Sequence, residues 1–204
     1  MVYALGMAAV AVCAVTGALA AGRKRLDGIG VLFLAIVTAL GGGTLRDVLL
    51  GSHPLFWIQD TNYLLVAVVF GVLTMATGRL WLRLERALVL GDALGLALFT
   101  AFGAQKAVEL GSPPAVVIVM GVITGVAGGI LRDLMVGEIA FVFLKGTLYA
   151  SAALLATVLL VALLRFGVPL EPGLSACTIL CLLLRLAAIQ WNLTIPIFDL
   201  REKA

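Results

Sequence analysis

Residues 41–51 read GGGTLRDVLLG and residues 127–137 read AGGILRDLMVG, so six of the eleven aligned positions are identical. Chance identity is only about one in ten per position at average residue usage. Both copies lie in strongly apolar surroundings, where a bilayer makes irregular backbone and charge expensive. Because the sequence carries this energetic cost at two places, the two copies indicate a functional element.

The composition indicates an integral membrane protein. Hydrophobic residues make up 63% of the chain and charged residues 12%, and the mean hydropathy is +1.18. Seven runs low in charge approach the roughly 20 residues that cross a bilayer as a helix. They lie at 2–21, 28–50, 62–77, 87–105, 114–136, 147–164 and 173–190. The predicted fold class is therefore all-α, with seven transmembrane helices.

The similarity extends beyond the glycines without gaps. A shift of 86 residues also pairs Gly17 with Gly103 and Tyr63 with Tyr149. Each unit holds three predicted helices, and an odd number of crossings makes the second unit enter the membrane from the opposite side. We therefore expect two inverted three-helix repeats, followed by a seventh helix outside the symmetry. The expected units are residues 1–86, 87–172 and 173–204.

Basic residues set the expected orientation. Nothing basic precedes the first apolar run, and residues 23–25 (RKR) follow it, which is the reverse of a cleaved signal peptide. The run is thus expected to be retained, with the N-terminus outside and the C-terminus in the cytoplasm. Nine basic residues then lie inside and two, Lys106 and Arg165, outside. The inside residues are Arg23, Lys24, Arg25, Arg79, Arg83, Arg86, Lys145, Arg201 and Lys203.

The clustered glycines predict discontinuous or kinked second and fifth helices, because consecutive glycines weaken a helical backbone. The residues concerned are Gly41, Gly42, Gly43, Gly128 and Gly129. Freed backbone carbonyls near Gly41, Gly42 and Gly128 would then offer a transient site for a monovalent cation. The alternative is tight helix packing. Packing is the favoured role of Gly91, Gly95, Gly121 and Gly125, which have small-xxx-small spacing.

Two charged pairs follow the glycines, Arg46-Asp47 and Arg132-Asp133. Neighbouring helical residues point about 100° apart, so an ideal bridge within a pair is not expected. Each side chain should instead bond to another helix or to the broken backbone, or line a wet cavity. Bracing of the helices and a role in a pore remain equal alternatives.

Two further charges, Asp92 and Lys106, break the symmetry, since the matching positions are Gly6 and Ala20. Lys106 either extends to the outer interface or points into a water-filled passage as a positive barrier. Asp92 either pairs near the inner end of its helix or attracts cations into a cytoplasmic vestibule.

Three stretches resemble the bacterial relatives of the trimeric intracellular cation (TRIC) channels: residues 41–51, residues 92–107 (DALGLALFTAFGAQKA) and residues 127–138 (AGGILRDLMVGE). The resemblance covers nearly the whole chain. It implies a homotrimer in the bacterial inner membrane, with one hourglass pore per protomer lined by helices two and five. The implied permeants are potassium and also sodium. Similar bacterial sequences are labelled putative glycine transporters, so a carrier of a small amino acid is the alternative. A purely structural or lipid-organising protein ranks third.

Catalysis and cofactors find little support in the sequence. The single histidine, His53, precedes a proline in a predicted outer loop, and no phosphate-binding glycine loop occurs. Cys177 and Cys181 share a helix face but have no adjacent metal-ligating partner. We therefore expect neither an enzyme nor a resident metal. The net charge of +3 indicates contact with anionic lipid, and nucleic acid is not expected as a partner.

Overall fold

The computed structural model describes residues 2–81, 85–143 and 148–193, without the side chains of residues 2 and 79–87. These residues form eight α-helices and one short 3₁₀ helix, and they contain no strand. The elements are α1 Val2–Arg23, α2 Gly28–Leu49, α3 Phe56–Gln59, α4 Asn62–Trp81, α5 Glu85–Glu109, α6 Pro114–Met135, η1 Phe141–Phe143, α7 Ala150–Arg165 and α8 Leu170–Trp191.

Each of the seven predicted apolar runs corresponds to one long helix, while α3 and η1 were not expected. Five helices, α1, α2, α5, α6 and α8, are long and apolar enough to cross a membrane. Two shorter apolar stretches lie in α4 and α7, at 62–78 and 150–165. The chain is thus an all-helical, multi-pass membrane protein. Four of the basic residues used for orientation, Arg83, Lys145, Arg201 and Lys203, lie outside the described residues.

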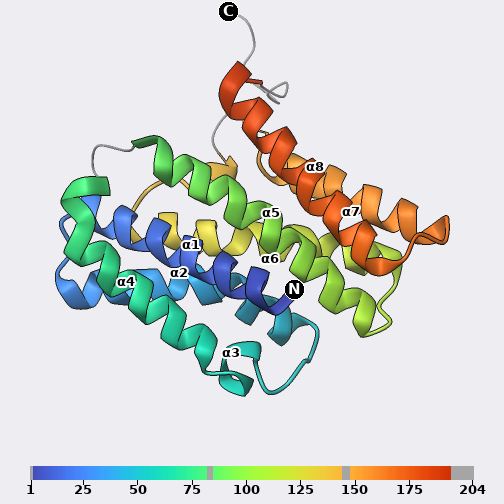
Figure 1. The fold of residues 1–204 in the computed structure, drawn as a ribbon, viewed down its shortest axis with the longest axis horizontal. Coiled ribbons are helices and arrows are strands. Elements are labelled where there is room, and N and C mark those ends of the chain that lie inside the picture. Colours follow the sequence, from blue (N-terminus) through green and yellow to red (C-terminus); the bar gives the residue numbers. More distant parts are fainter. Residues whose placement is uncertain (1, 82–84, 144–147, 194–204) are drawn as a thin grey trace, which may run out of the picture.

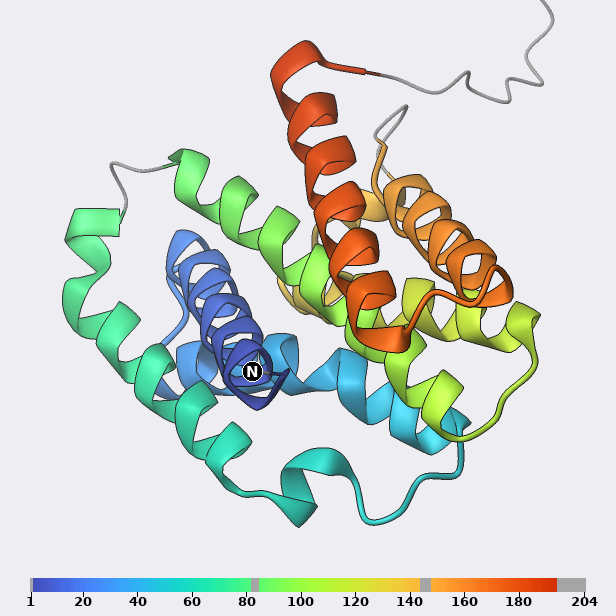
Figure 2. The same ribbon diagram turned by 45° about the vertical axis from the view of Figure 1, so that its right-hand side comes forward.

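Four helices form the centre of the bundle, with the others on its flanks. In Figure 1, α4 lies on one flank and α7 and α8 on the other, with α1, α2, α5 and α6 between them. The packing agrees, since α4 contacts α1 and α2, whereas α7 contacts α6 and α8. Figure 2 shows α7 and α8 side by side. Under the shift of 86 residues, α1, α2 and α4 correspond to α5, α6 and α7.

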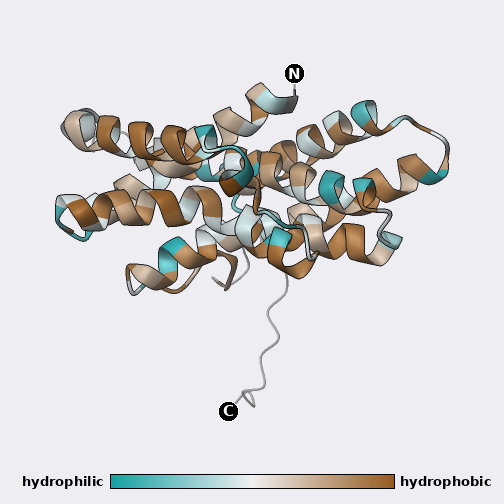
Figure 3. Cartoon of the chain, turned by 90° about the horizontal axis from the view of Figure 1, so that it is seen from below, coloured by the Kyte–Doolittle hydropathy of each residue, from teal (hydrophilic) through white to brown (hydrophobic). Residues whose placement is uncertain are grey.

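The hydrophobic core is divided in the same way. One cluster includes Val10, Leu34 and Phe99 and involves mainly α1 and α2, and the other includes Leu96, Val117 and Leu160 from α5, α6 and α7. Large apolar side chains such as Ile29 and Leu134 are exposed. Figure 3 shows hydrophobic residues along the helices and hydrophilic ones mainly near their ends. An apolar outer surface is what contact with lipid requires.

The last glycine of each copied string ends its helix. Gly51 follows α2 with φ +63° and Gly137 follows α6 with φ +71°. This left-handed conformation is open to glycine without steric cost, and it terminates helices. The chain then turns back toward the bundle at the same point of each repeat.

The helices α2 and α6 cross backbone against backbone at Gly42 and Gly128. A Cβ added at Gly128 would lie 2.5 Å from the carbonyl oxygen of Thr38. A Cβ added at Gly42 would collide with the carbonyl oxygen of Thr124. A shift of 86 residues converts each contact into the other, so the crossing is reciprocal. Only glycine permits so close an approach.

Of the two expected forms, a discontinuous helix is not present, because α2 and α6 are continuous α-helix through Gly41–Gly43 and Gly128–Gly129. A kink at these glycines stays a prediction. The glycines remove side chains where neighbouring groups lie close. A Cβ at Gly41 would meet Leu131 and one at Gly43 would meet Phe56, each at 2.5 Å. A Cβ at Gly129 would lie 3.0 Å from the Tyr149 hydroxyl. Close packing, the alternative interpretation, therefore describes these glycines.

The crossing predicts a specific sensitivity to one added methyl group. Gly128→Ala should lower the free energy of unfolding by about 1–3 kcal/mol, because the Thr38 carbonyl is backbone and cannot swing aside. Gly22→Ala is the matched control, since a Cβ there meets nothing within 4 Å. Thermal denaturation of the purified proteins in detergent measures the difference. Equal melting temperatures would contradict the crossing.

Candidate functional site

Arg46 and Asp47 form a buried pair with each other. The Nε and Nη2 atoms of Arg46 donate to Oδ1 of Asp47 at 2.8 and 2.7 Å. The Asp47 Oδ2 atom accepts the backbone N–H of Phe56 at 2.8 Å. Asp47 is 1% exposed, so burial of its charge is compensated by these three donors.

Arg132 and Asp133 repeat this arrangement. The Arg132 Nε atom donates to Oδ1 of Asp133 at 2.8 Å, and Asp133 Oδ2 accepts the backbone N–H of Phe141 at 2.9 Å. The expectation that neighbours within a pair would not bridge is therefore wrong. The arginine side chain is long enough to bend back beside its own helix, and a buried carboxylate strongly favours the nearest donor. The backbone bonds of the two aspartates come from Phe56 of α3 and Phe141 of η1, and not from the glycine segments as expected.

Asp92 adds a third charge to the second pair only. Its Oδ1 atom accepts a bond from Nη1 of Arg132 at 2.8 Å and ties α5 to α6. Asp92 and Arg132 are 9% and 3% exposed. The position equivalent to Asp92 is Gly6, so Arg46 has no second carboxylate among the described residues. The structure therefore shows Asp92 in a pairing role, which is one of its two interpretations.

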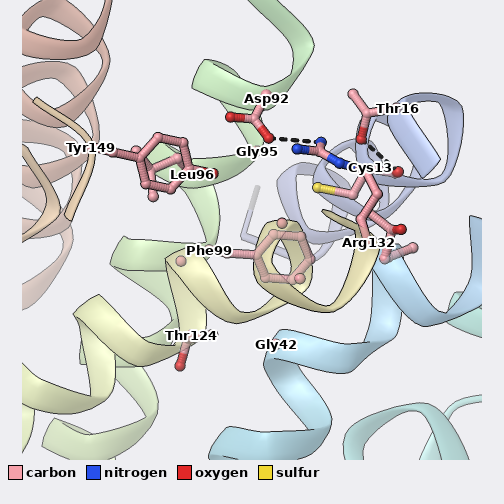
Figure 4. A pocket seen from close by; sticks show the side chains of 15 residues that line it. Cys13, Thr16, Gly42, Asp92, Gly95, Leu96, Phe99, Thr124, Arg132 and Tyr149 are labelled. Carbon is pink, nitrogen blue, oxygen red and sulfur yellow. Dashed lines mark hydrogen bonds and ion pairs between the residues drawn. The ribbon is translucent and has the colours of Figure 1, made fainter. Parts of the chain in front are cut away.

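A small central cavity lies where the two copied strings meet. Its volume of about 20 Å³ is room for about one water molecule. Its lining includes Gly42, Gly128, Thr38, Thr124, Asp92 and Arg132. Figure 4 shows Asp92 bonded to Arg132, with Phe99 from the same helix as Asp92 and Tyr149 from the start of α7. Polar groups from both halves thus converge on one small space.

A larger cavity, here called the Lys106 cavity, lies beside the first part of α1 and the last turns of α2 and α5. Its volume is about 320 Å³. Arg46, Lys106, Gly6 and Tyr63 contribute to its lining. Phe99 lines this cavity as well as the central one and so separates the two spaces. Lys106 is half-buried and contributes to the cavity wall.

Several lining residues were not predicted. Thr38 and Thr124 occupy equivalent positions and each donates its hydroxyl to a backbone carbonyl one turn earlier, at 2.7 and 2.6 Å. The 86-residue shift could have identified this pair. Tyr149 was noted only as a match of Tyr63, and Phe99 carries no signal in an apolar run.

Arg185 of α8 is a further buried charge that sequence reasoning left unassigned. It is 2% exposed, and its guanidinium carbon lies 5.1 Å from the Phe141 ring centre and 4.8 Å from that of Tyr149. Its Nη1 atom donates to the Leu148 carbonyl at 3.4 Å. Cation–π contact therefore fastens α8 to the second repeat. Among the residues searched, no group of three or more His, Cys, Asp or Glu side chains could hold a metal ion.

Solved structures carry the same arrangement of helices. The TRIC channel orthologue from Rhodobacter sphaeroides superposes with a TM-score of 0.89 at 40% identity, covering 94% of this chain and 98% of that one. The chain belongs to the TRIC family. A second TRIC cation channel matches with a TM-score of 0.89 at 27% identity, covering 97% of each chain. The TRIC channel from C. elegans, at 17% identity and a TM-score of 0.61, shares the fold alone.

The sequence comparisons agree with this membership. The family model described as "Glycine transporter" matches this TRIC-family chain twice, at residues 3–79 and 89–165. A shift of 86 residues carries one match onto the other. The UPF0126 inner membrane protein YadS of Escherichia coli K12 is 43% identical over 99% of this chain and 98% of its own length. A UPF0126 membrane protein of Vibrio cholerae is 43% identical over 99% of this chain and 84% of its own.

The unequal charge networks predict unequal costs of losing each arginine. Arg132→Gln leaves two buried carboxylates, Asp92 and Asp133, without their cation and should cost roughly 3–5 kcal/mol of stability. Arg46→Gln leaves only Asp47, which keeps the Phe56 N–H, and should cost less. Unfolding of both variants in mixed micelles with increasing SDS measures the two losses. A greater loss for Arg46→Gln would refute the asymmetry.

Proposed function

We propose that this protein is a channel for monovalent cations, potassium foremost and sodium as well. The path runs between α1, α2, α5 and α6 of each protomer, from the Lys106 cavity past Phe99 to the central cavity. The observation that carries this proposal is a water-sized space in the centre of the bundle that is lined by polar groups from both repeats.

The cation ligands in this proposal differ from those that the sequence indicated. Because α2 and α6 are continuous α-helix, we propose side-chain oxygens as the main cation ligands in place of the carbonyl groups near Gly41, Gly42 and Gly128. The available oxygens are those of Asp92, Thr38 and Thr124, which line the central cavity. Asp92 gives this half of the path its cation preference, while Arg46, Asp47, Arg132 and Asp133 mainly brace the helix ends.

The proposed assembly is a homotrimer with one hourglass-shaped pore per protomer, embedded in lipid. Its support is the naming of the similar solved structures as trimeric intracellular cation channels. The narrow central cavity, with a wider one beyond Phe99, is compatible with one pore in each chain.

The proposed topology has seven crossings, with the N-terminus outside the bacterial inner membrane and the C-terminus in the cytoplasm. It divides the chain into inverted units 1–86 and 87–172 and a final part, 173–204. The double match of the family model supports the repeat. The exposed basic residues between α1 and α2 support the orientation, because such residues gather on the cytoplasmic side. The Lys106 cavity then faces outward.

A secondary transporter of a small amino acid such as glycine is the alternative. Its support is the description of the family model that matches three quarters of the chain's length. Inverted repeats around a closed central site suit a carrier as well as a channel. Both alternatives are non-enzymatic membrane transport.

Recording from the purified protein in planar bilayers distinguishes the two. A channel should produce discrete picoampere steps whose reversal potential follows the potassium gradient, because a continuous wet path passes ions far faster than alternating access does. Absence of such steps, together with saturable uptake of glycine into proteoliposomes, would establish the carrier instead.

Asp92→Asn should lower the cation conductance at least about twofold, because it removes the negative charge at the central cavity while retaining an oxygen for Arg132. Asp27→Asn is the matched control, since Asp27 is an exposed helix cap and asparagine caps equally well. Single-channel currents in symmetric KCl give the comparison. Equal currents in wild type and Asp92→Asn would remove Asp92 from the path.

Lys106→Gln should raise the potassium conductance about two- to fivefold, because a positive charge beside the path repels cations. The same recordings measure it, with Lys24→Gln as a control at an exposed loop. An unchanged conductance would indicate that Lys106 only extends to the interface.

A further inference from the structure

Two cationic groups, Arg46 and Lys106, line the Lys106 cavity. The second repeat has a carboxylate, Asp92, at a position where the first repeat has none. Arg46 directs Nε and Nη2 to Asp47, which leaves Nη1 without an acidic partner among the described residues. Among the described residues, Lys106 likewise forms no ion pair within 4 Å. Glu109 also lines the cavity, and its Oε1 atom accepts the side-chain amide of Gln105 at 2.7 Å.

The contacts of Arg132 in the second repeat indicate the kind of group that suits the Nη1 atom of Arg46. In that repeat the Nη1 atom of Arg132 donates to the Asp92 carboxylate at 2.8 Å, while Nε holds Asp133. The position equivalent to Asp92 is Gly6, which lines the Lys106 cavity. The first repeat thus keeps the guanidinium donor but has no carboxylate at the equivalent position, which borders the Lys106 cavity beside Tyr63.

The space suits a small ligand. A volume of about 320 Å³ holds a molecule of a few non-hydrogen atoms with accompanying water. The Tyr63 hydroxyl lies 3.0 Å from the site of a Cβ on Gly6, so it borders the place of the absent carboxylate. The Tyr3 hydroxyl, also in the lining, already donates to Asp60 at 2.8 Å. The Tyr63 hydroxyl is therefore the donor placed beside this position, while the Tyr3 hydroxyl is already engaged.

We propose that the Lys106 cavity binds a small carboxylate anion, held by Nη1 of Arg46 and the ammonium group of Lys106 in the place that Asp92 occupies in the second repeat. The donors suit a carboxylate, because Asp47 occupies only the Nε and Nη2 atoms of Arg46 and no ion pair is formed by Lys106 among the described residues. A free carboxylic acid and an amino acid share this chemistry. An amino acid would add an ammonium group, for which Glu109 is the nearest acid in the lining.

The test measures binding of acetate and of glycine to the purified full-length protein in chloride-free buffer, by isothermal titration calorimetry. Gly6→Asp supplies the missing carboxylate from the chain itself and should weaken acetate binding at least about tenfold, the value of one charge-assisted hydrogen bond. Gly6→Ala adds the same Cβ without charge and should still bind. Gly22→Asp, at the opposite end of α1 with nothing within 4 Å of its Cβ, is the matched charge control.

A second variant keeps the test decisive if Gly6→Asp does not fold. Lys106→Gln should also weaken acetate binding about tenfold, through loss of the ammonium contact. Equal affinity for acetate and glycine assigns a carboxylate site, and tighter binding of glycine adds a contact to its ammonium group. Absence of acetate and glycine binding to the wild-type protein, or unchanged binding in Lys106→Gln, overturns the proposal. Because binding is measured without current, its failure is distinct from failure of the channel proposal.

Discussion

The contact between the backbones of α2 and α6 is the constraint on which the rest of the structure depends. Gly42 and Gly128 each face a threonine carbonyl of the other helix. The backbones of the two helices therefore approach as closely as helix packing allows. This crossing brings the two copied strings to one central cavity. It also places the Arg-Asp pair of each string beyond the crossing, near the end of its own helix.

The charged pairs make this arrangement tolerable inside an apolar bundle. Each aspartate is held by its own arginine and by a backbone N–H of the following segment, so the turn after each helix is bound to the helix itself. The pairs are equivalent in geometry but differ in total charge, because Asp92 joins only the second. That difference gives the two ends of the central region unlike electrostatic character, whatever ion or solute passes between them.

The sequence predicted the helical class, because the length and apolarity of the runs determine it. It also singled out Arg46, Asp47, Arg132 and Asp133, while bracing and a role in a pore stayed equal alternatives. It failed on their partners, since a bond between neighbours depends on how far an arginine side chain bends. It failed on the helix continuity at the glycines for a related reason. A glycine run is compatible with a break or with a close contact, and only the position of the second helix decides between them.

The crossing has a consequence for how such a bundle can be assembled. Since Gly42 meets Thr124 just as Gly128 meets Thr38, a single three-helix unit contains both halves of the contact. Two identical copies of that unit would therefore be able to associate through the same surface. Such a dimer would carry the same residue at both equivalent sites. In one polypeptide the equivalent positions Gly6 and Asp92 can differ, so that one repeat carries a charge that the other lacks.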